Sequence, residues 1–169
     1  MSIEKYIATI IEREGGFVDN PSDKGGATKY GVTLNTLSEY MGRECTIDDI
    51  KNLPVDTAYK IFKDRYFIKS GIVNIRDYNL QAIMLDTAVN SGEGRAVKLL
   101  QQALGIKDDG IIGAVTIQFA NAAMIEPLRK KYMSLRIRFL GRIIEKDHTQ
   151  ATFAAGWLNR CGDLLETLV

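Results

Sequence analysis

Cysteine, histidine and tryptophan are scarce in this sequence. Its 169 residues include 2 cysteines, 1 histidine and 1 tryptophan. Cys45 and Cys161 form neither a CxxC pair nor a metal-spaced cluster, so they indicate neither a redox motif nor a zinc site, and we expect two reduced thiols. His148 lies in a polar stretch without a serine or cysteine nucleophile motif, so we assign it no catalytic role.

Long apolar runs and an excess of charge are also missing. No apolar run approaches the roughly 18 residues of a membrane span, and residues 1–5 lack the basic and apolar regions of a signal peptide. Lysine and arginine number 22 against 21 aspartate and glutamate residues, a formal net charge of +1. We therefore expect synthesis in a cytoplasm, no nucleic-acid partner, and electrostatic attraction that is only local.

The remaining composition is that of a globular domain. Apolar residues make up 46% and charged residues 25%, far from the profile of a disordered chain. The chain has only 3 prolines, and it shows no internal repeat or proline-rich linker that would separate two domains. We predict a single domain over residues 1–169.

Helical periodicity dominates the chain. An apolar stripe at helical spacing begins at Ile3 and ends before Gly15, which predicts a first helix with Glu14 in its last turn. Residues 15–31 then hold five of the 15 glycines together with several turn formers, which predicts a small, irregular β-hairpin. Further helices are predicted over residues 33–41, from 46, over 56–67, 77–91 and 95–104, after 113, and over 128–142.

The segment 128–142 combines basic charge with two apolar strips. Its basic residues are Arg129, Lys130, Lys131, Arg136, Arg138 and Arg142, and it contains no acidic residue. The apolar strips are wider than those of a surface helix, so we predict a deeply packed central helix. Its charges form either a solvated rim or a binding surface for an anionic partner, such as cell-wall polymer or lipopolysaccharide of an outer membrane.

Two carboxylates and a hydroxyl follow one another with the spacing Glu-x8-Asp-x4-Thr, as Glu14, Asp23 and Thr28. Two carboxyl groups across a cleft suit the cleavage of a glycosidic bond, in which one protonates the leaving oxygen and the other activates water. The dipole at the end of a helix disfavours a charged Glu14, whereas a polar turn favours an ionised Asp23. Capping and turn residues are the alternative interpretation.

The segment from Glu14 to Thr33 resembles the signature of the phage and prophage N-acetylmuramidases of glycoside hydrolase family 108. The resemblance continues through Asp86–Gly92, Leu100–Gly105, Asp109–Thr116 and Gly156–Arg160, and so spans nearly the whole chain. It implies a mainly α-helical, lysozyme-like α+β fold with a small β-hairpin lobe and a larger helical lobe. It also implies that Glu14 is the catalytic acid, with Asp23 and Thr28 as its partners.

Further implications of the resemblance concern domain organisation and release. Residues 1–87, with the hairpin at 15–33, would be the catalytic part, and residues 88–169 a helical lobe like a peptidoglycan-binding region. As in phage endolysins, a separate membrane-permeabilising holin would release the protein to the cell wall. A lysozyme of this size is expected to be a monomer.

Five residues outside the carboxylate pattern are candidates for binding the sugar chain. Asp86 and Asn90 lie four residues apart on one helical face, and the alternative is a capped helix end. Gln101 is a candidate for the same cleft or an exposed helix residue. Tyr30 and Trp157 have aromatic faces suited to a pyranose ring, although large aromatic residues such as Trp157 more often belong to a core.

No metal ion or cofactor is expected. The acidic turns around residues 19–23 and 108–110 do not satisfy the calcium-loop pattern. The resemblance implies hydrolysis of the β-1,4 bond between N-acetylmuramic acid and N-acetylglucosamine, and a carboxylate assisted by a hydroxyl favours direct attack by water with inversion. Two alternatives remain open: a lytic transglycosylase that uses Glu14 alone, and a non-catalytic peptidoglycan-binding module.

Overall fold

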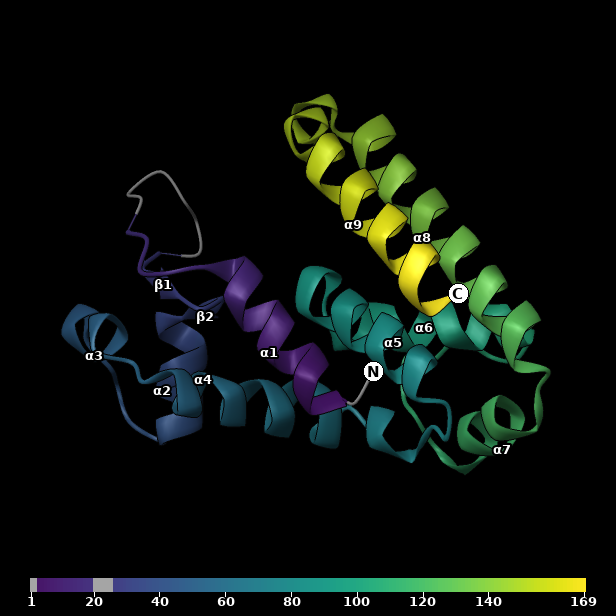
Figure 1. Ribbon diagram of the computed structural model, residues 1–169, viewed down its shortest axis with the longest axis horizontal. Coiled ribbons are helices and arrows are strands. Elements are labelled where there is room, and N and C mark those ends of the chain that lie inside the picture. The colour runs from purple at the N-terminus through teal and green to yellow at the C-terminus, as the bar shows by residue number, and fades with distance from the viewer. Residues whose placement is uncertain (1–2, 20–25) are drawn as a thin grey trace. The chain divides into compact units, whose positions relative to one another are not determined.

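The computed structural model describes residues 3–19 and 26–169 of the chain. They form two compact units, Met1–Lys69 and Ser70–Val169, which we call the N-terminal and the C-terminal unit (Figure 1). Within the described residues, no helix combines the length and the apolar character that crossing a membrane requires.

Helix α1 (Ile3–Glu14) opens the N-terminal unit, and its apolar stripe is buried as its spacing predicts. The buried residues are Ile3, Tyr6, Ile7, Ile10 and Ile11. Gly15 follows the helix with a φ of 76°, a left-handed conformation that glycine adopts without steric cost. The helix therefore stops directly after Glu14, as predicted.

A two-stranded antiparallel hairpin lies between the first two helices. Strand β1 (Thr28–Lys29) pairs with strand β2 (Val32–Thr33), and Val18 adds a bridge to β1 through two backbone hydrogen bonds of 2.8 Å. The turn residues Tyr30 and Gly31 have φ values of 55° and 75°. Two consecutive positive φ angles are typical of the type I′ turn, whose twist matches that of the strands. The predicted hairpin is confirmed.

Two short helices follow the hairpin, as predicted, and each begins with a side-chain cap. Helix α2 (Leu34–Met41) begins with a side-chain cap from Thr33 and ends at Gly42, which has a left-handed conformation. Helix α3 (Ile47–Lys51) begins with a capping box, in which Thr46 and the acidic residue three positions later satisfy each other's backbone N–H groups.

The next predicted helix, residues 56–67, changes its geometry halfway. It begins as α4 (Val55–Ile61) and continues as the π-helix η1 (Phe62–Lys69). Phe62 and Phe67 are both buried and lie five residues apart, a spacing that an α-helix would turn toward different faces. The wider π-turn, with its i→i+5 hydrogen bonds, lets both rings point inward.

Helix α5 (Tyr78–Ser91) is the central helix of the C-terminal unit. Its nine consecutive residues 80–88 are all buried, so the protein surrounds this part of the helix instead of covering one stripe. It packs against α6 (Glu93–Leu104), α9 (Ala154–Leu168) and the short 3₁₀ helix η2 (Ile72–Asn74). Helix α6 ends at a left-handed glycine, as the sequence predicts.

The remaining helices are α7 (Ala114–Ala122), α8 (Ile125–Lys146) and the 3₁₀ helix η3 (His148–Phe153). Figure 1 shows α8 and α9 running side by side in opposite directions. The buried residues of α8 form a single face: Leu128, Tyr132, Met133, Arg136 and Leu140. The prediction that residues 128–142 form the central helix is therefore wrong, because charged residues keep the other face of α8 in solvent and α5 occupies the centre.

The predicted class, mainly α-helical with a small hairpin, is confirmed. The two compact units meet at Lys69 and Ser70, whereas the sequence analysis divides the catalytic and helical parts at residues 87 and 88. The difference arises because α5 packs on the helices that follow it in sequence. That residues 1–169 act as one lysozyme-like domain stays a prediction.

Candidate active site

Glu14 is half-buried at the end of α1. The backbone N–H of Gly15 donates to the carbonyl oxygen of Ile11 at 3.3 Å, and the carbonyl oxygen of Gly15 accepts from the N–H of Tyr30 at 3.0 Å. The second bond joins the residue after Glu14 to the turn of the hairpin. Two elements therefore fix the backbone around this carboxylic acid.

The side chain of Glu14 packs on the hairpin turn at Gly31. A Cβ atom placed on Gly31 would lie 2.9 Å from Cγ of Glu14, 3.2 Å from its Cβ, and 3.2 Å from Cζ of Phe62. These distances are shorter than van der Waals contact, so only glycine leaves room for the glutamate here. The turn at Gly31 thus packs closely on the aliphatic part of Glu14, and the buried ring of Phe62 packs on the same turn.

Of the other two predicted catalytic residues, the structure describes one. Thr28 lies in β1, half-buried, and belongs to the hairpin whose turn contacts Glu14. Asp23 lies outside the described residues, so its prediction is untested. The sequence spacing thus brings Glu14 and the strand that carries Thr28 into one small structure.

Tyr30 belongs to the same structure and has an unusual backbone conformation. It is the non-glycine residue with positive φ among those described, at a turn position that usually holds asparagine, aspartate or glycine. Its half-buried ring lies 5.1 Å from Nζ of Lys29. Strained backbone conformations of this kind cluster at binding sites, and the contact between Tyr30 and sugar stays a prediction.

Asp86, predicted to bind substrate, instead forms a buried ionic cluster in the C-terminal unit. The side chain of Asp86 is 0% exposed, and its oxygens accept from Nη2 of Arg136 at 2.6 Å and from Nε of Arg160 at 2.8 Å. The substrate-binding prediction is corrected, since a carboxylate enclosed by two guanidinium groups is unavailable to sugar. Asp86 offsets the charges of two arginines on different helices.

Asn90 lies one helical turn after Asp86 and is exposed. With its amide oriented so that the oxygen faces the two arginines, Oδ1 accepts from Arg136 at 3.3 Å and from Arg160 at 3.1 Å. The amide nitrogen then points away from the cluster. Asn90 therefore joins the ionic cluster through its oxygen, while its prediction as a sugar ligand stays a prediction for the amide nitrogen.

Gln101 has a structural role in place of the predicted contact with substrate. It is 1% exposed, and its Nε2 donates to Asp109 Oδ1 at 2.8 Å, to the carbonyl oxygen of Ile111 at 3.0 Å and to Thr116 Oγ1 at 3.1 Å. Its Oε1 accepts from the N–H of Gly110 at 2.8 Å. Because both ends of the amide are occupied within the protein, Gln101 holds the loop between α6 and α7.

Trp157 lies near the start of α9, half-buried, where its ring stacks on Phe153 at a centroid distance of 6.0 Å. Phe153 is itself exposed, so this aromatic pair lies at the surface of the C-terminal unit and outside its core. The sequence analysis favoured a core position for Trp157, which the structure corrects. Its contact with sugar stays a prediction.

The sequence analysis missed the roles of three residues. Arg136 was counted among the basic residues of segment 128–142 that form a solvated rim or an anion-binding surface, yet it is 1% exposed and pairs with Asp86. Arg160 completes that cluster, and Gly31 makes room for Glu14. A signal for Arg136 was present, because it falls on the same helical face as the buried Leu128 and Tyr132.

Potential metal ligands do not cluster in the described part of the chain, and both thiols are buried. The described part of the chain holds no group of three or more histidine, cysteine, aspartate or glutamate residues placed to bind a metal ion. Cys45 and Cys161 are free and buried. Burial raises the pKa of the Cys161 thiol above its usual value, which keeps the thiol protonated and unreactive.

Two family models match the chain. The model described as glycosyl hydrolase 108 covers residues 7–92, and the model described as a predicted peptidoglycan domain covers residues 95–162. A solved structure titled "Structure of Brucella abortus SagA" is 32% identical, with a TM-score of 0.83, over 95% of this chain and 89% of that chain. No curated protein matches.

The fold and these matches define a class of protein, the glycoside hydrolases with a lysozyme-like fold. Within that class, the chain belongs to the glycosyl hydrolase 108 family. The resemblance of the segment from Glu14 to Thr33 to this family is thereby confirmed. The matched region includes all of the hairpin and α1 from its fifth residue onward.

Proposed function

We propose that this protein is a peptidoglycan hydrolase that cleaves the β-1,4 bond between N-acetylmuramic acid and N-acetylglucosamine, with Glu14 as the general acid. The observation that carries the proposal is the close packing of Glu14, at the end of α1, on the hairpin turn at Gly31. The family match supports a hydrolase of glycosidic bonds, and the predicted peptidoglycan domain supports the polymer.

The proposed reaction begins with proton transfer from Glu14 to the glycosidic oxygen. As the bond to that oxygen breaks, positive charge develops on the anomeric carbon of the sugar, and water attacks this carbon. Asp23 accepts the proton that the water releases, and Thr28 orients the water. Direct attack by water gives inversion, and inverting glycoside hydrolases in general hold their two carboxyl groups about 6.5–9.5 Å apart.

We also propose a phage origin for this protein. The family match does not depend on that origin, so the proposal rests on the sequence resemblance alone. On this proposal the enzyme is made in the cytoplasm of a bacterial host and reaches the wall after a holin permeabilises the membrane. It acts as a monomer on bacterial peptidoglycan.

The decisive experiment compares the soluble fragments that wild type and Glu14→Gln release from purified peptidoglycan, measured by mass spectrometry. We expect reducing muramic acid ends from the wild type, and a loss of at least about a hundredfold in Glu14→Gln, because a general acid contributes this much or more. Glu12→Gln is the matched control, since Glu12 is an exposed residue of the same helix. Full activity of a folded Glu14→Gln variant would exclude Glu14 as the acid.

The same fragments distinguish the two alternatives. A lytic transglycosylase leaves 1,6-anhydro ends and needs one carboxyl group, so Asp23→Asn would keep most of its activity. A non-catalytic binding module would sediment with cell walls while releasing nothing soluble, in the wild type as in every variant. Under our proposal, Asp23→Asn loses activity and the ends are reducing.

A further inference from the structure

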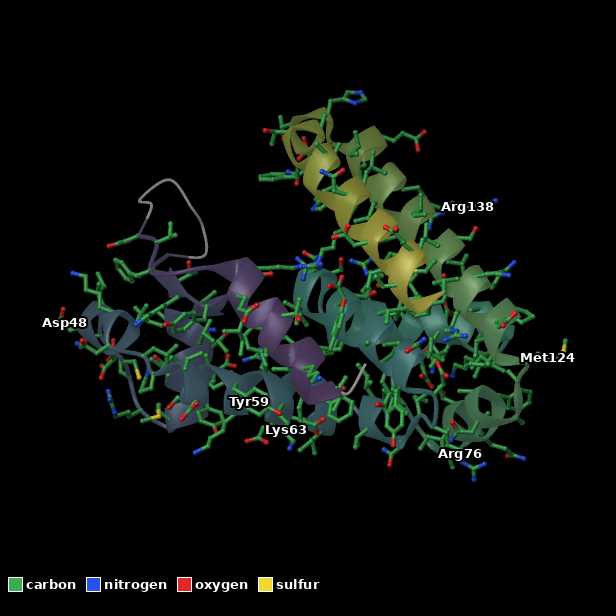
Figure 2. The ribbon with its side chains drawn as sticks, viewed as in Figure 1. Asp48, Tyr59, Lys63, Arg76, Met124 and Arg138 are labelled. Atoms are coloured by element: carbon green, nitrogen blue, oxygen red, sulfur yellow. The ribbon has the colours of Figure 1, made fainter. Side chains whose placement is uncertain are left out.

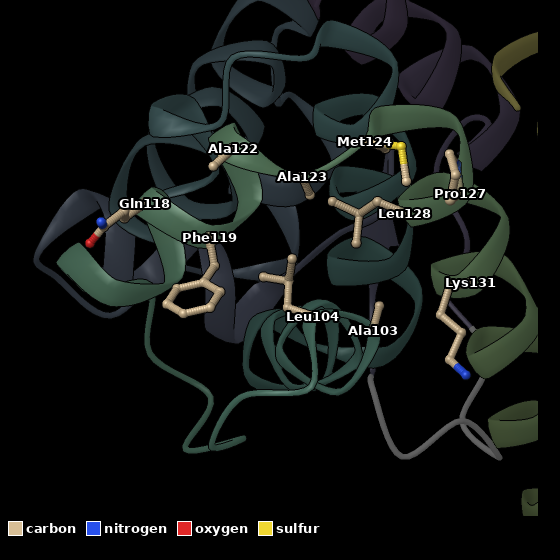
Figure 3. A pocket seen from close by; sticks show the side chains of 10 residues that line it. All are labelled: Ala103, Leu104, Gln118, Phe119, Ala122, Ala123, Met124, Pro127, Leu128 and Lys131. Carbon is tan, nitrogen blue, oxygen red and sulfur yellow. The ribbon is translucent and has the colours of Figure 1, made fainter.

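An apolar groove crosses the surface of the C-terminal unit where α6, α7 and α8 meet (Figure 3). Its volume is about 640 Å³, within the range of ligand pockets. The groove lies wholly within the segment that matches the predicted peptidoglycan domain. The lining residues come from the end of α6, the second half of α7 and the beginning of α8.

The lining of this groove is apolar except at two places. Phe119 and Leu104 lie in the middle of the groove in Figure 3, and Met124, which Figure 2 shows at the outer edge of the unit, is 79% exposed. Gln118 and Lys131 lie on opposite sides of these apolar side chains. Clustered apolar side chains that remain in water mark a binding surface.

Lys131 is the one charged residue that lines the groove. It is exposed and makes no ion pair with any residue that the structure describes. By contrast, Arg129 on the same helix lies 3.7 Å from Asp77. A ligand that fits the groove therefore has small apolar groups and a carboxylate for Lys131.

Peptidoglycan offers two chemically different parts to such a groove. Its sugar chain carries many hydroxyl and amide groups, which need a matching set of hydrogen-bonding side chains, and the groove provides only Gln118 and Lys131. Its stem peptide carries alanine methyl groups and free carboxylates. The peptide matches both the apolar lining and the single positive charge.

We infer that this groove binds the stem peptide of peptidoglycan, with alanine methyl groups on Phe119 and Leu104 and a carboxylate on Lys131. The inference rests on the proposed function, because it takes peptidoglycan as the substrate. It assigns the peptide to the C-terminal unit and leaves the glycan to the hairpin and Glu14 in the N-terminal unit. Binding to the groove would raise the local concentration of glycan for cleavage.

The test measures binding to full-length Glu14→Gln protein by calorimetry, so that no turnover occurs. The probes are a disaccharide tetrapeptide, the free tetrapeptide, and the disaccharide without peptide. We expect the free tetrapeptide to bind, and Lys131→Glu and the groove-filling variant Ala122→Trp each to weaken its binding about tenfold or more, by loss of the ion pair or of the apolar surface.

Two control variants make the same changes of charge and size at residues outside the groove. Lys130→Glu reverses an exposed charge next to Lys131, and Val115→Trp adds the same ring to an exposed position of α7. Neither residue lines the groove, so both variants should bind the tetrapeptide as the parent does. Equal thermal stability of all four variants shows that they are folded.

Three results would overturn the inference. In the first, the tetrapeptide fails to bind. In the second, the disaccharide without peptide binds and Ala122→Trp abolishes that binding. In the third, the protein is a dimer that Ala122→Trp dissociates, so that the groove is an interface between copies. Hydrolysis of glycan strands stripped of peptide separates this inference from the proposed function. Lys131→Glu should hydrolyse them like the wild type, whereas activity of Glu14→Gln on them would contradict the proposed function without affecting the groove.

Discussion

At the scale of single residues, Gly31 and Tyr30 determine how Glu14 is presented. Gly31 leaves the space that Cβ and Cγ of Glu14 occupy, and the N–H of Tyr30 holds the backbone of Gly15 at the end of α1. An acid that transfers a proton must lie within hydrogen-bonding distance of the accepting oxygen, about 2.6–3.2 Å between heavy atoms, and small displacements from a productive geometry cost rate. These two turn residues are therefore positioning residues for the proposed acid.

Gly31→Ala should lower kcat about tenfold to a hundredfold, because the new methyl group displaces the side chain of Glu14. Gly42→Ala is the control, since Gly42 has a similar φ of 65° and an added Cβ would meet nothing within 4 Å. Both variants carry the cost of a left-handed alanine, about 1–2 kcal/mol. Steady-state kinetics and urea unfolding separate the effects, and an equal loss of kcat in both variants would refute the positioning role.

Tyr30→Asn should separate backbone strain from contact with substrate. Asparagine tolerates a positive φ better than tyrosine, so we expect the free energy of unfolding to stay equal or rise by up to about 1 kcal/mol. If the ring of Tyr30 binds sugar, KM rises severalfold while kcat changes little. A variant with unchanged KM would remove Tyr30 from the list of substrate-binding residues.

At the scale of elements, the C-terminal unit is organised around α5 and the charges that it buries. Arg136 on α8 and Arg160 on α9 both reach Asp86 on α5, so one carboxylate connects three helices. Tyr132, one turn before Arg136, is fully buried and donates its hydroxyl to the carbonyl oxygen of Ala96 at 3.2 Å. Burial raises the pKa of Tyr132 above its usual value, so the hydroxyl stays a donor.

Asp86→Asn should destabilise the protein by about 3–5 kcal/mol, because it leaves two arginines without a buried counter-charge. Asp56→Asn makes the same chemical change at an exposed position in the first turn of α4, where we expect about 1 kcal/mol at most. Urea unfolding followed by circular dichroism measures both values. A loss below about 1 kcal/mol in Asp86→Asn would show that the cluster contributes little to stability.

The exposed face of α8 retains part of the predicted basic surface. Arg129 and Arg136 are paired with aspartates, whereas Arg138 is exposed and projects away from α8 in Figure 2. Arg142 is also exposed. The predicted binding of an anionic partner, such as lipopolysaccharide, therefore depends on the exposed face of α8 alone.

Charge reversal at Arg138 and Arg142 tests this surface. The double variant R138E/R142E should bind lipopolysaccharide vesicles severalfold more weakly at low salt, with the difference shrinking as salt screens the charges. Lys60→Glu combined with Lys69→Glu changes the same number of charges at exposed positions of the N-terminal unit. If both double variants bound the vesicles equally, the exposed charges of α8 would be a solvated rim and not a binding surface.

At the scale of the whole molecule, family boundaries and structural boundaries differ. The family models meet between residues 92 and 95, yet the compact units meet at Lys69 and Ser70. Helix α5 thus matches the hydrolase model in sequence while it packs on α6 and α9 in the structure. The C-terminal unit needs α5 to bury its apolar faces.

Two fragments test this boundary. A fragment of residues 70–169 should be helical and unfold cooperatively, whereas a fragment of residues 95–169 should be largely unfolded, because it lacks the nine consecutive buried residues of α5. Circular dichroism and thermal unfolding measure the difference. Cooperative unfolding of the shorter fragment would place the structural boundary at the family boundary.

Much of the local structure could be predicted because it depends on neighbouring residues. The stripe of α1 and the helices that begin after Thr33 and Thr46 are local effects of periodicity and of side-chain oxygens near free N–H groups. The glycine-rich hairpin follows from turn chemistry in the same way. Glu14 and Thr28 belong to one continuous segment, so the sequence could place both at the helix end and the hairpin, while their catalytic roles stay predictions.

The sequence by itself thus determined most of the helices, the hairpin and the position of Glu14 at the end of α1, because each depends on residues a few positions apart. Only the tertiary structure decided that Asp86 and Gln101 are structural, that Arg136 is buried, and that Gly31 confines Glu14. Those facts depend on contacts between distant segments. Burial of a polar side chain is settled by the partners that packing brings to it.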